Sequence, residues 1–178
     1  MPFTSIRSAR KARLLRTWLP VLACAAIFAL ESTACFGADR TSRPLQRLTQ
    51  LLVGHRLDFE WPTVHFYLRK TGHFLGYGLF SLVCFRSFWL TLAEARKVFW
   101  RKAASHGLAL LSVLLVASLD EFHQSFLPNR TGHVGDVVLN TCGAAALGLV
   151  LFVAMLAAEG ASRRGGSRPT APLVQPAA

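Results

Sequence analysis

Four long apolar stretches constrain the fold of this chain more than any other feature of its sequence. They run over residues 18–36, 67–85, 103–119 and 134–158. A helix needs about 20 mostly apolar residues to cross the roughly 30 Å hydrocarbon core of a bilayer, and each stretch has about that length. The 178 residues leave no region long enough for a separate soluble domain. The sequence therefore predicts an all-helical, polytopic membrane protein whose four transmembrane helices form a small bundle.

The regions outside these stretches are short and mostly basic. We expect a basic N-terminal segment over residues 1–17, a membrane domain over residues 18–158 and a disordered basic tail over residues 159–178. The first connection contains PLQRLTQLL, a pattern that predicts one short amphipathic helix. A cleaved signal peptide is an alternative interpretation of the N-terminus. Glu31 and the length of the apolar stretch argue against it.

Basic residues are distributed unevenly between the two sides of the predicted bundle. The formal charge of +11 would suggest nucleic-acid binding in a soluble protein, but beside four spans it indicates topology and lipid contact. The N-terminus, the connection over residues 86–102 and the tail carry more Lys and Arg than residues 37–70 and Arg130 on the other side. The positive-inside rule therefore predicts cytoplasmic termini, a multi-pass protein of the cell (inner or plasma) membrane, and no nucleic-acid partner.

A polar run separates the third and fourth apolar stretches. This run, DEFHQSFLPNRTGHVGDVVLN, lies at the outer ends of both helices in the predicted topology. Asp120 and Glu121 precede Gln124 by four and three residues, so these side chains can lie near one side of the third helix. Asp136 and Asn140 are one turn apart on the fourth helix. A lone ionisable group within a span is costly and a paired one is tolerated, so we expect these side chains to meet.

The second apolar stretch enters the membrane from the same side and brings basic residues to the polar run. Lys70, His73 and Tyr77 are spaced at i, i+3 and i+7, which places them on one helical face. Arg130 lies in the loop after the third helix, and its guanidinium can bridge two carboxylates or bind a phosphate. Glu31, near the outer end of the first stretch, is a further candidate for this cluster. We therefore expect a polar site on the outer face.

Small residues recur at four-residue spacing beside these polar side chains. Gly72 and Gly76 form such a pair on the second stretch, and Asn140, Ala144 and Gly148 continue the spacing on the fourth. Small residues at this spacing permit transmembrane helices to approach closely. The sequence therefore predicts close helix approach along both faces.

At these residues the sequence resembles the VanZ-like family of integral membrane proteins. KTGHFLGYGLFSL matches the family's K-x-x-H-F-x-x-Y stretch, and DEFHQSFLPNRTGHVGDVVLNTCGAAALG matches its D-E-x-x-Q-x-F-x-P-x-R, D-x-x-x-N-x-x-G signature. The resemblance covers about residues 18–158. It implies a small multi-span protein of the cell envelope. The founding member is associated with low-level resistance to the glycopeptide teicoplanin, so the resemblance also implies a resistance-type role.

The first hypothesis for the polar site is the binding of an anionic envelope ligand, such as a lipid phosphate or a peptide carboxylate. Arg130 and Lys70 would hold the charge, and the carboxylates would contact hydroxyl or amine groups. Candidate partners are membrane lipids, a lipid-linked cell-wall precursor or a glycopeptide. The ligand-binding candidates are the charged and hydrogen-bonding residues of the cluster: Lys70, His73, Tyr77, Asp120, Glu121, Gln124, Arg130, Asp136 and Asn140.

The second hypothesis is a membrane enzyme that acts on a lipid-linked substrate. Clustered carboxylates raise one another's pKa and a nearby histidine can move protons, so His73, Asp120 and Glu121 are the catalytic candidates. We expect no cofactor and no resident metal, because the four cysteines lie in apolar segments and form no CxxC pair. A divalent cation between Asp120, Glu121 and Asp136 is a less favoured alternative.

The third hypothesis is a purely structural clamp. Arg130 and Lys70 would neutralise the three carboxylates, and the amides of Gln124 and Asn140 would form hydrogen bonds between helices. Buried ion pairs are often no better for stability than apolar residues of similar volume, which favours a functional site over this alternative. Transport or proton conduction is a further alternative that would require an oligomer.

Overall fold

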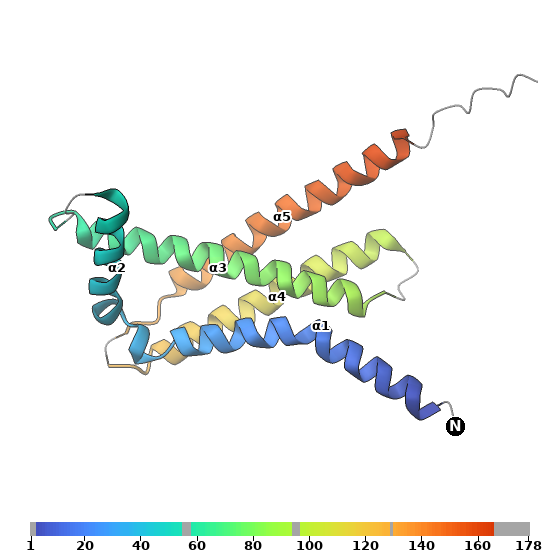
Figure 1. Cartoon of the computed structure of the whole chain (residues 1–178), viewed down its shortest axis with the longest axis horizontal. Coiled ribbons are helices and arrows are strands. Elements are labelled where there is room, and N and C mark those ends of the chain that lie inside the picture. The colour runs from blue at the N-terminus through green and yellow to red at the C-terminus, as the bar shows by residue number, and fades with distance from the viewer. Residues whose placement is uncertain (1–2, 55–57, 94–96, 129, 166–178) are drawn as a thin grey trace, which may run out of the picture.

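The computed structural model describes residues 3–54, 58–93, 97–128 and 130–165, and all regular secondary structure in these ranges is helical. The elements, in chain order, are α1 (Phe3–Glu31), the short 3-10 helix η1 (Ala34–Phe36), α2 (Ala38–Val53), α3 (Trp61–Thr91), α4 (Val98–Gln124) and α5 (Val134–Gly165) (Figure 1). Helix α5 includes the first residues of the predicted disordered tail, and the tail from residue 166 onward lies outside the described residues.

Four helices are long and apolar enough to cross a membrane. Their candidate spans are Ala12–Glu31, Trp61–Thr91, Val98–Gln124 and Val134–Ser162. The prediction of a four-span, all-helical membrane protein is therefore confirmed. The first span ends at Glu31, five residues before its predicted end, because the chain turns through Ser32 and Thr33 into η1. The other three spans extend beyond their predicted limits into polar residues.

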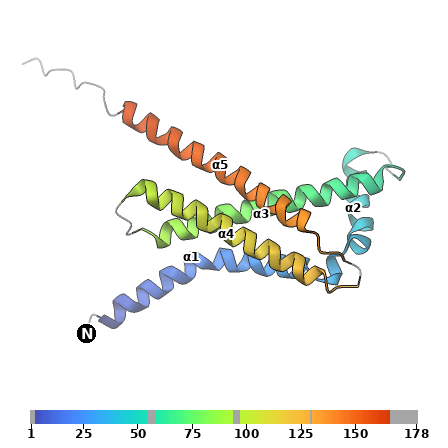
Figure 2. The same ribbon diagram turned by 180° about the vertical axis from the view of Figure 1, so that it is seen from behind.

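Helix α3 lies at the centre of the bundle and packs against α1, α4 and α5. Figure 2 shows α5 crossing α3 and α4, with the free ends of α1 and α5 at the same end of the bundle. The buried core is formed by α3, α4 and α5, and its members are Tyr77, Phe80, Cys84, Phe85, Ala109, Val113, Ala117 and Ala144. Many large apolar side chains outside this core are exposed, as expected for a surface that faces lipid.

The closest approach between α3 and α5 involves glycines other than the predicted pair. A Cβ added at Gly143 would lie 2.1 Å from the carbonyl oxygen of Phe74, and one at Gly78 would lie 3.0 Å from the carbonyl oxygen of Gly143. A Cβ at Gly72 would meet nothing within 4 Å, and one at Gly76 would lie 3.7 Å from Phe28. Gly76 is rotated by about 200° from Gly78 around the axis of α3. The predicted pair therefore lies on another face of the helix.

The predicted amphipathic helix is confirmed as α2, which runs across the ends of α1 and α3 (Figure 1). The indole Nε1 of Trp61 donates a hydrogen bond of 2.7 Å to Ser42 Oγ, which fixes α2 to the start of α3. Leu51 and Leu52 remain exposed on α2. We call this end of the bundle, which also carries the last turns of α1 and α4 and the first turns of α3 and α5, the α2 end.

Candidate functional site

The nine predicted ligand-binding residues lie on α3, α4, α5 and the loop between α4 and α5, toward the α2 end. They do not form a single cluster. One group lines a cavity between α1, α3 and α4, and its predicted members are His73, Asp120, Gln124 and Arg130. The other predicted residues are either packed between helices or paired at the α3–α5 contact.

Asp120 connects α3 to α4 through a buried hydrogen-bond group. Tyr77 Oη donates to Asp120 Oδ2 at 3.0 Å, and Gln124 Nε2 donates to Asp120 Oδ1 at 2.8 Å. All three residues are buried. Both carboxylate oxygens of Asp120 therefore have a partner in the protein, and the bond from Gln124 lies within α4. The prediction that Gln124 bonds between helices is wrong for that reason.

Glu121 holds the loop that leads into α5. Its Oε2 accepts a hydrogen bond of 2.9 Å from the backbone N–H of His133, the residue before α5 begins. A carboxylate at this position satisfies a free N–H and is favoured by the helix dipole. Gly132 is required beside it, because an added Cβ would lie 2.2 Å from the carbonyl oxygen of Glu121. Glu121 therefore acts on the local structure and does not line the cavity.

Lys70 and Asp136 form an ion pair between α3 and α5. The two side chains are 31% and 23% exposed, so the pair lies near the polar boundary of the bundle and not in its core. The ammonium of Lys70 also lies 5.3 Å from the centre of the Phe66 ring. The predicted neutralisation of a carboxylate by Lys70 is confirmed for Asp136.

Arg130 does not bridge carboxylates as predicted. Its Nη2 donates to the backbone carbonyl oxygens of Glu31 at 2.7 Å and Thr33 at 3.1 Å, which ties the α4–α5 loop to the end of α1. Its Nε is buried and has no hydrogen-bond partner among the described residues. Helix ends leave carbonyl groups without partners, and these carbonyls attract the guanidinium.

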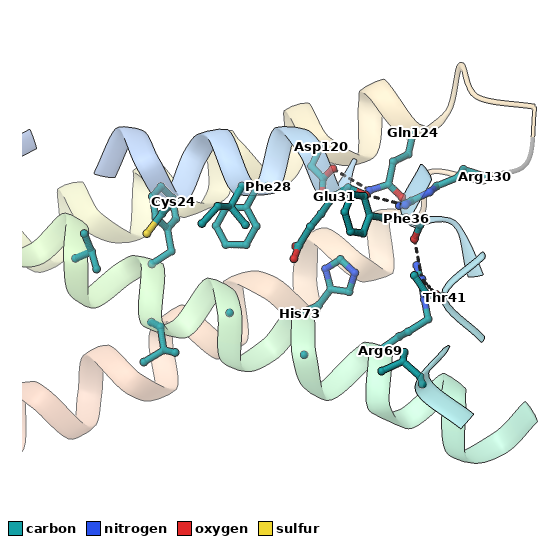
Figure 3. Close-up of a pocket in the computed structure, with 17 residues that line it drawn as sticks. Cys24, Phe28, Glu31, Phe36, Thr41, Arg69, His73, Asp120, Gln124 and Arg130 are labelled. Atoms are coloured by element: carbon teal, nitrogen blue, oxygen red, sulfur yellow. Dashed lines mark hydrogen bonds between the residues drawn. The ribbon is translucent and has the colours of Figure 1, made fainter. Parts of the chain in front are cut away.

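The cavity has a volume of about 420 Å³, and Phe36, Thr41 and Leu45 line it at the α2 end. Figure 3 shows Phe36 and Thr41 beside Arg69 and Arg130. One end of it is polar. We call this set of lining residues the polar end: Glu31, Arg69, His73, Asp120, Gln124 and Arg130. The opposite part is lined by apolar side chains and a cysteine, which we call the apolar arm: Cys24, Ile27, Phe28, Leu79, Phe80 and Val83.

Arg69 is a member of the polar end that was not among the predicted ligand-binding residues. Its Nη1 donates to the carbonyl oxygen of Phe36 at 3.2 Å and to Thr41 Oγ1 at 3.3 Å. Arg69 precedes His73 by four residues, so the same helical spacing that grouped Lys70 with His73 could have included it. The sequence gives no comparable signal for Thr41, because only the fold brings α2 to this point.

His73 lines the polar end, and its ring is stacked on Tyr77 with a centroid distance of 6.3 Å. Asn140 behaves differently. It is fully buried, and neither its Oδ1 nor its Nδ2 has a hydrogen-bond partner among the described residues, so the predicted interhelical bond is not formed.

Within the described ranges no three His, Cys, Asp or Glu side chains are grouped to hold a metal ion. The alternative of a cation between the three carboxylates therefore has no geometric support.

Comparison with known protein families identifies the family of this chain. The family described as VanZ/LLP1 matches residues 17–156. The chain belongs to the VanZ/LLP1 family. The resemblance inferred from the two sequence motifs is thereby confirmed. No curated protein and no solved structure gave a significant match. All nine predicted site residues, and both arginines of the polar end, fall within the region that matches the VanZ/LLP1 family.

Proposed function

We propose that this VanZ/LLP1 protein binds an anionic ligand of the cell envelope at the polar end of the cavity, from the outer side of the membrane. The observation that carries the proposal is the hydrogen bonding of Arg69 and Arg130. Both guanidinium groups line the cavity, and both donate to neutral acceptors, namely backbone carbonyls and the hydroxyl of Thr41. Neither forms an ion pair with a carboxylate among the described residues, although the Glu31 carboxylate is near enough to attract both.

Charged groups near the membrane interior are costly unless they have a partner. Asp120 is unsuited to be that partner, because both of its oxygens accept hydrogen bonds from Tyr77 and Gln124. A phosphate or carboxylate of a ligand would offer the planar, two-point acceptor that guanidinium groups prefer. Glu31 lies at the same end of the cavity and offers an acceptor for hydroxyl or amine groups of the ligand.

A binding assay on the purified, full-length protein tests this function. We would titrate hexadecyl phosphate and hexadecanol into the protein in a nonionic detergent and follow binding by calorimetry. The parent is expected to prefer the phosphate, and Arg69→Gln and Arg130→Gln are each expected to weaken its binding about tenfold, or about 1.4 kcal/mol. Arg43→Gln, on the exposed face of α2, is the matched control and should bind as the parent does.

A parent protein that binds the alcohol as tightly as the phosphate would contradict the proposal. Arg130 also ties the loop to α1, so the unfolding temperature of each variant must be measured beside its affinity. Arg130→Lys keeps the positive charge but loses the two-point hydrogen bonding of the guanidinium group, so it should retain part of the affinity. Adding teicoplanin as a competitor in the same assay tests whether the ligand class extends to glycopeptides.

An enzyme acting on a lipid-linked substrate is the second candidate function, and the observation in its favour is that His73 and Asp120 line one cavity. Its support is weaker, because Asp120 is held by two donors and Glu121 caps α5. His73→Gln distinguishes the two functions. Both functions predict that this variant keeps most of its affinity for hexadecyl phosphate, so turnover decides between them. Catalysis predicts that the parent converts a lipid-linked substrate and that this turnover is lost in the variant, whereas pure binding predicts no turnover by either protein.

A further inference from the structure

We infer that the ligand of this cavity is an amphiphile, a phosphate-bearing molecule with an alkyl chain that lies in the apolar arm between α1 and α3. The inference rests on the proposed anion site and adds the chemical class of the rest of the ligand. It is carried by the order of polar and apolar residues along the cavity, by two glycines that the protein's own packing does not require, and by the exposure of the cavity wall toward lipid.

The lining residues of α3 change from charged to apolar along the helix. Arg69, Gly72 and His73 come first, Gly76 follows on the same face, and Leu79, Phe80 and Val83 come last. From Arg69 to Val83 the helix rises about 21 Å, at 1.5 Å per residue. One leaflet of the hydrocarbon core is about 15 Å thick, or half of the whole core. The cavity wall is therefore long enough to accompany an alkyl chain through one leaflet.

Helix α1 repeats this order on the opposite wall. Glu31 lies at the polar end, whereas Phe28, Ile27 and Cys24 line the apolar arm one to two turns away. Because α1 runs toward the α2 end and α3 runs away from it, both helices place their charged residues at the same end. A ligand that binds both walls must therefore be charged at one end and apolar at the other.

Gly72 and Gly76 leave the α3 wall without side chains where the polar end meets the apolar arm. A Cβ at Gly72 would meet nothing within 4 Å, and one at Gly76 would make only an ordinary contact with Phe28. Glycine in a helix interior is less favourable than alanine by about 1 kcal/mol. Gly78 and Gly143 are needed for helix packing, but Gly72 and Gly76 are not. The space they leave fits a chain that lies close to the α3 backbone.

The apolar arm is continuous with the lipid-facing surface. Ile27 and Leu79 line the cavity and are nevertheless 53% and 58% exposed. Beside the arm, helix α1 contacts α3 through Phe28, whose ring stacks on Tyr77 at 4.3 Å and meets Phe80 edge-on at 5.4 Å. Further side-chain contacts of α1 with α3 lie farther away, at Thr17 and Trp18, and α1 makes little contact with α4. A chain can therefore enter the arm sideways from the bilayer while its phosphate reaches the arginines.

Gly76→Val is the variant that tests the inference. Gly76 lies three residues past His73 and beside Phe28 of the apolar arm, and an added Cβ there would make only an ordinary contact with the Phe28 ring. We would measure its Kd for hexadecyl phosphate and for butyl phosphate by calorimetry in a nonionic detergent. It should raise the Kd for hexadecyl phosphate about tenfold or more and leave that for butyl phosphate unchanged. Gly160→Val, which has no neighbours within 4 Å and lies far along α5, is the matched control and should change neither value.

Two results would overturn the inference. One is a Gly76→Val protein that binds hexadecyl phosphate as the parent does. The other is a parent that binds both phosphates equally, since the site would then take a free phosphate and not a lipid. Gly76→Ala provides a smaller obstruction of the arm if the unfolding temperature of Gly76→Val is lowered. Failure of the anion site itself is distinguishable: Arg69→Gln would then bind both phosphates as the parent does, whatever the result for Gly76→Val.

Discussion

Tyr77 shows how a single side chain defines one wall of the site. It is fully buried on α3, its hydroxyl donates to Asp120 on α4, and its ring stacks on Phe28 of α1. It therefore links three spans at the boundary between the polar end and the apolar arm. The sequence predicted Tyr77 on the face of Lys70 and His73. It could not predict the partner, because the rotation of α4 is set by packing.

Removing the Tyr77 hydroxyl should destabilise the folded protein. Tyr77→Phe keeps the ring contacts and leaves Asp120 Oδ2 without its interhelical donor. We expect a loss of about 1–2 kcal/mol, the upper range for a hydrogen bond between transmembrane helices. The measurement is reversible denaturant unfolding in detergent. Tyr67→Phe, at the chain's other tyrosine, which is 63% exposed, should cost almost nothing. Equal effects of the two variants would show that the hydroxyl contributes little.

Asn140 is expected to respond in the opposite direction. A buried amide without partners costs about 1–3 kcal/mol relative to a satisfied one, and an apolar group of similar volume avoids that cost. Asn140→Val should therefore raise the unfolding temperature in detergent, whereas Asn140→Ala should not, since it leaves a cavity. If both variants are destabilised to the same degree, Asn140 has a hydrogen-bond partner in the membrane-embedded protein, and its burial has a structural reason.

At the scale of the helices, hydrophobic length was sufficient to predict four spans, but not where each helix ends. Residues 61–66 and 86–91 belong to α3 although they lie outside the predicted stretch of 67–85, because a helix continues past its apolar residues until a turn or cap ends it. Arg130 was misassigned for a related reason. Its partners are backbone carbonyls at the end of α1, and backbone groups leave no trace in a sequence pattern.

The contact between α3 and α5 should depend on Gly143. Gly143→Ala would bring a Cβ within 2.1 Å of the Phe74 carbonyl oxygen, a backbone atom that cannot move unless the helices separate. We expect a loss of about 1–3 kcal/mol or more and a lowered unfolding temperature. Gly135→Ala on the same helix has nothing within 4 Å and should be neutral or slightly stabilising. A neutral Gly143→Ala would mean that the two helices are farther apart than described.

For the whole molecule, the two ends of the bundle differ in character. The α2 end carries the polar end of the cavity, and the opposite end holds an ion pair between the buried Lys102 of α4 and Glu159 of α5. An even number of spans returns the chain to the end from which it started, and the free ends of α1 and α5 do lie together (Figure 2). The positive-inside rule assigns that end to the cytoplasm, and the proposed function depends on this assignment.

Native cysteines allow the orientation to be measured. Cys35 is exposed within η1 at the α2 end, whereas Cys24, Cys84 and Cys142 lie within the spans. A membrane-impermeant maleimide should label Cys35 in intact cells, and Cys35→Ala should lose that labelling. Ala93→Cys, in the Cys35→Ala background, should react only after the cells are opened, because Ala93 is exposed between α3 and α4 at the opposite end. The reverse pattern would turn the arginines of the cavity toward the cytoplasm. The anion site could then persist, but its ligand would have to come from the inner leaflet or the cytosol, since an envelope ligand on the outer side could not reach Arg69 or Arg130.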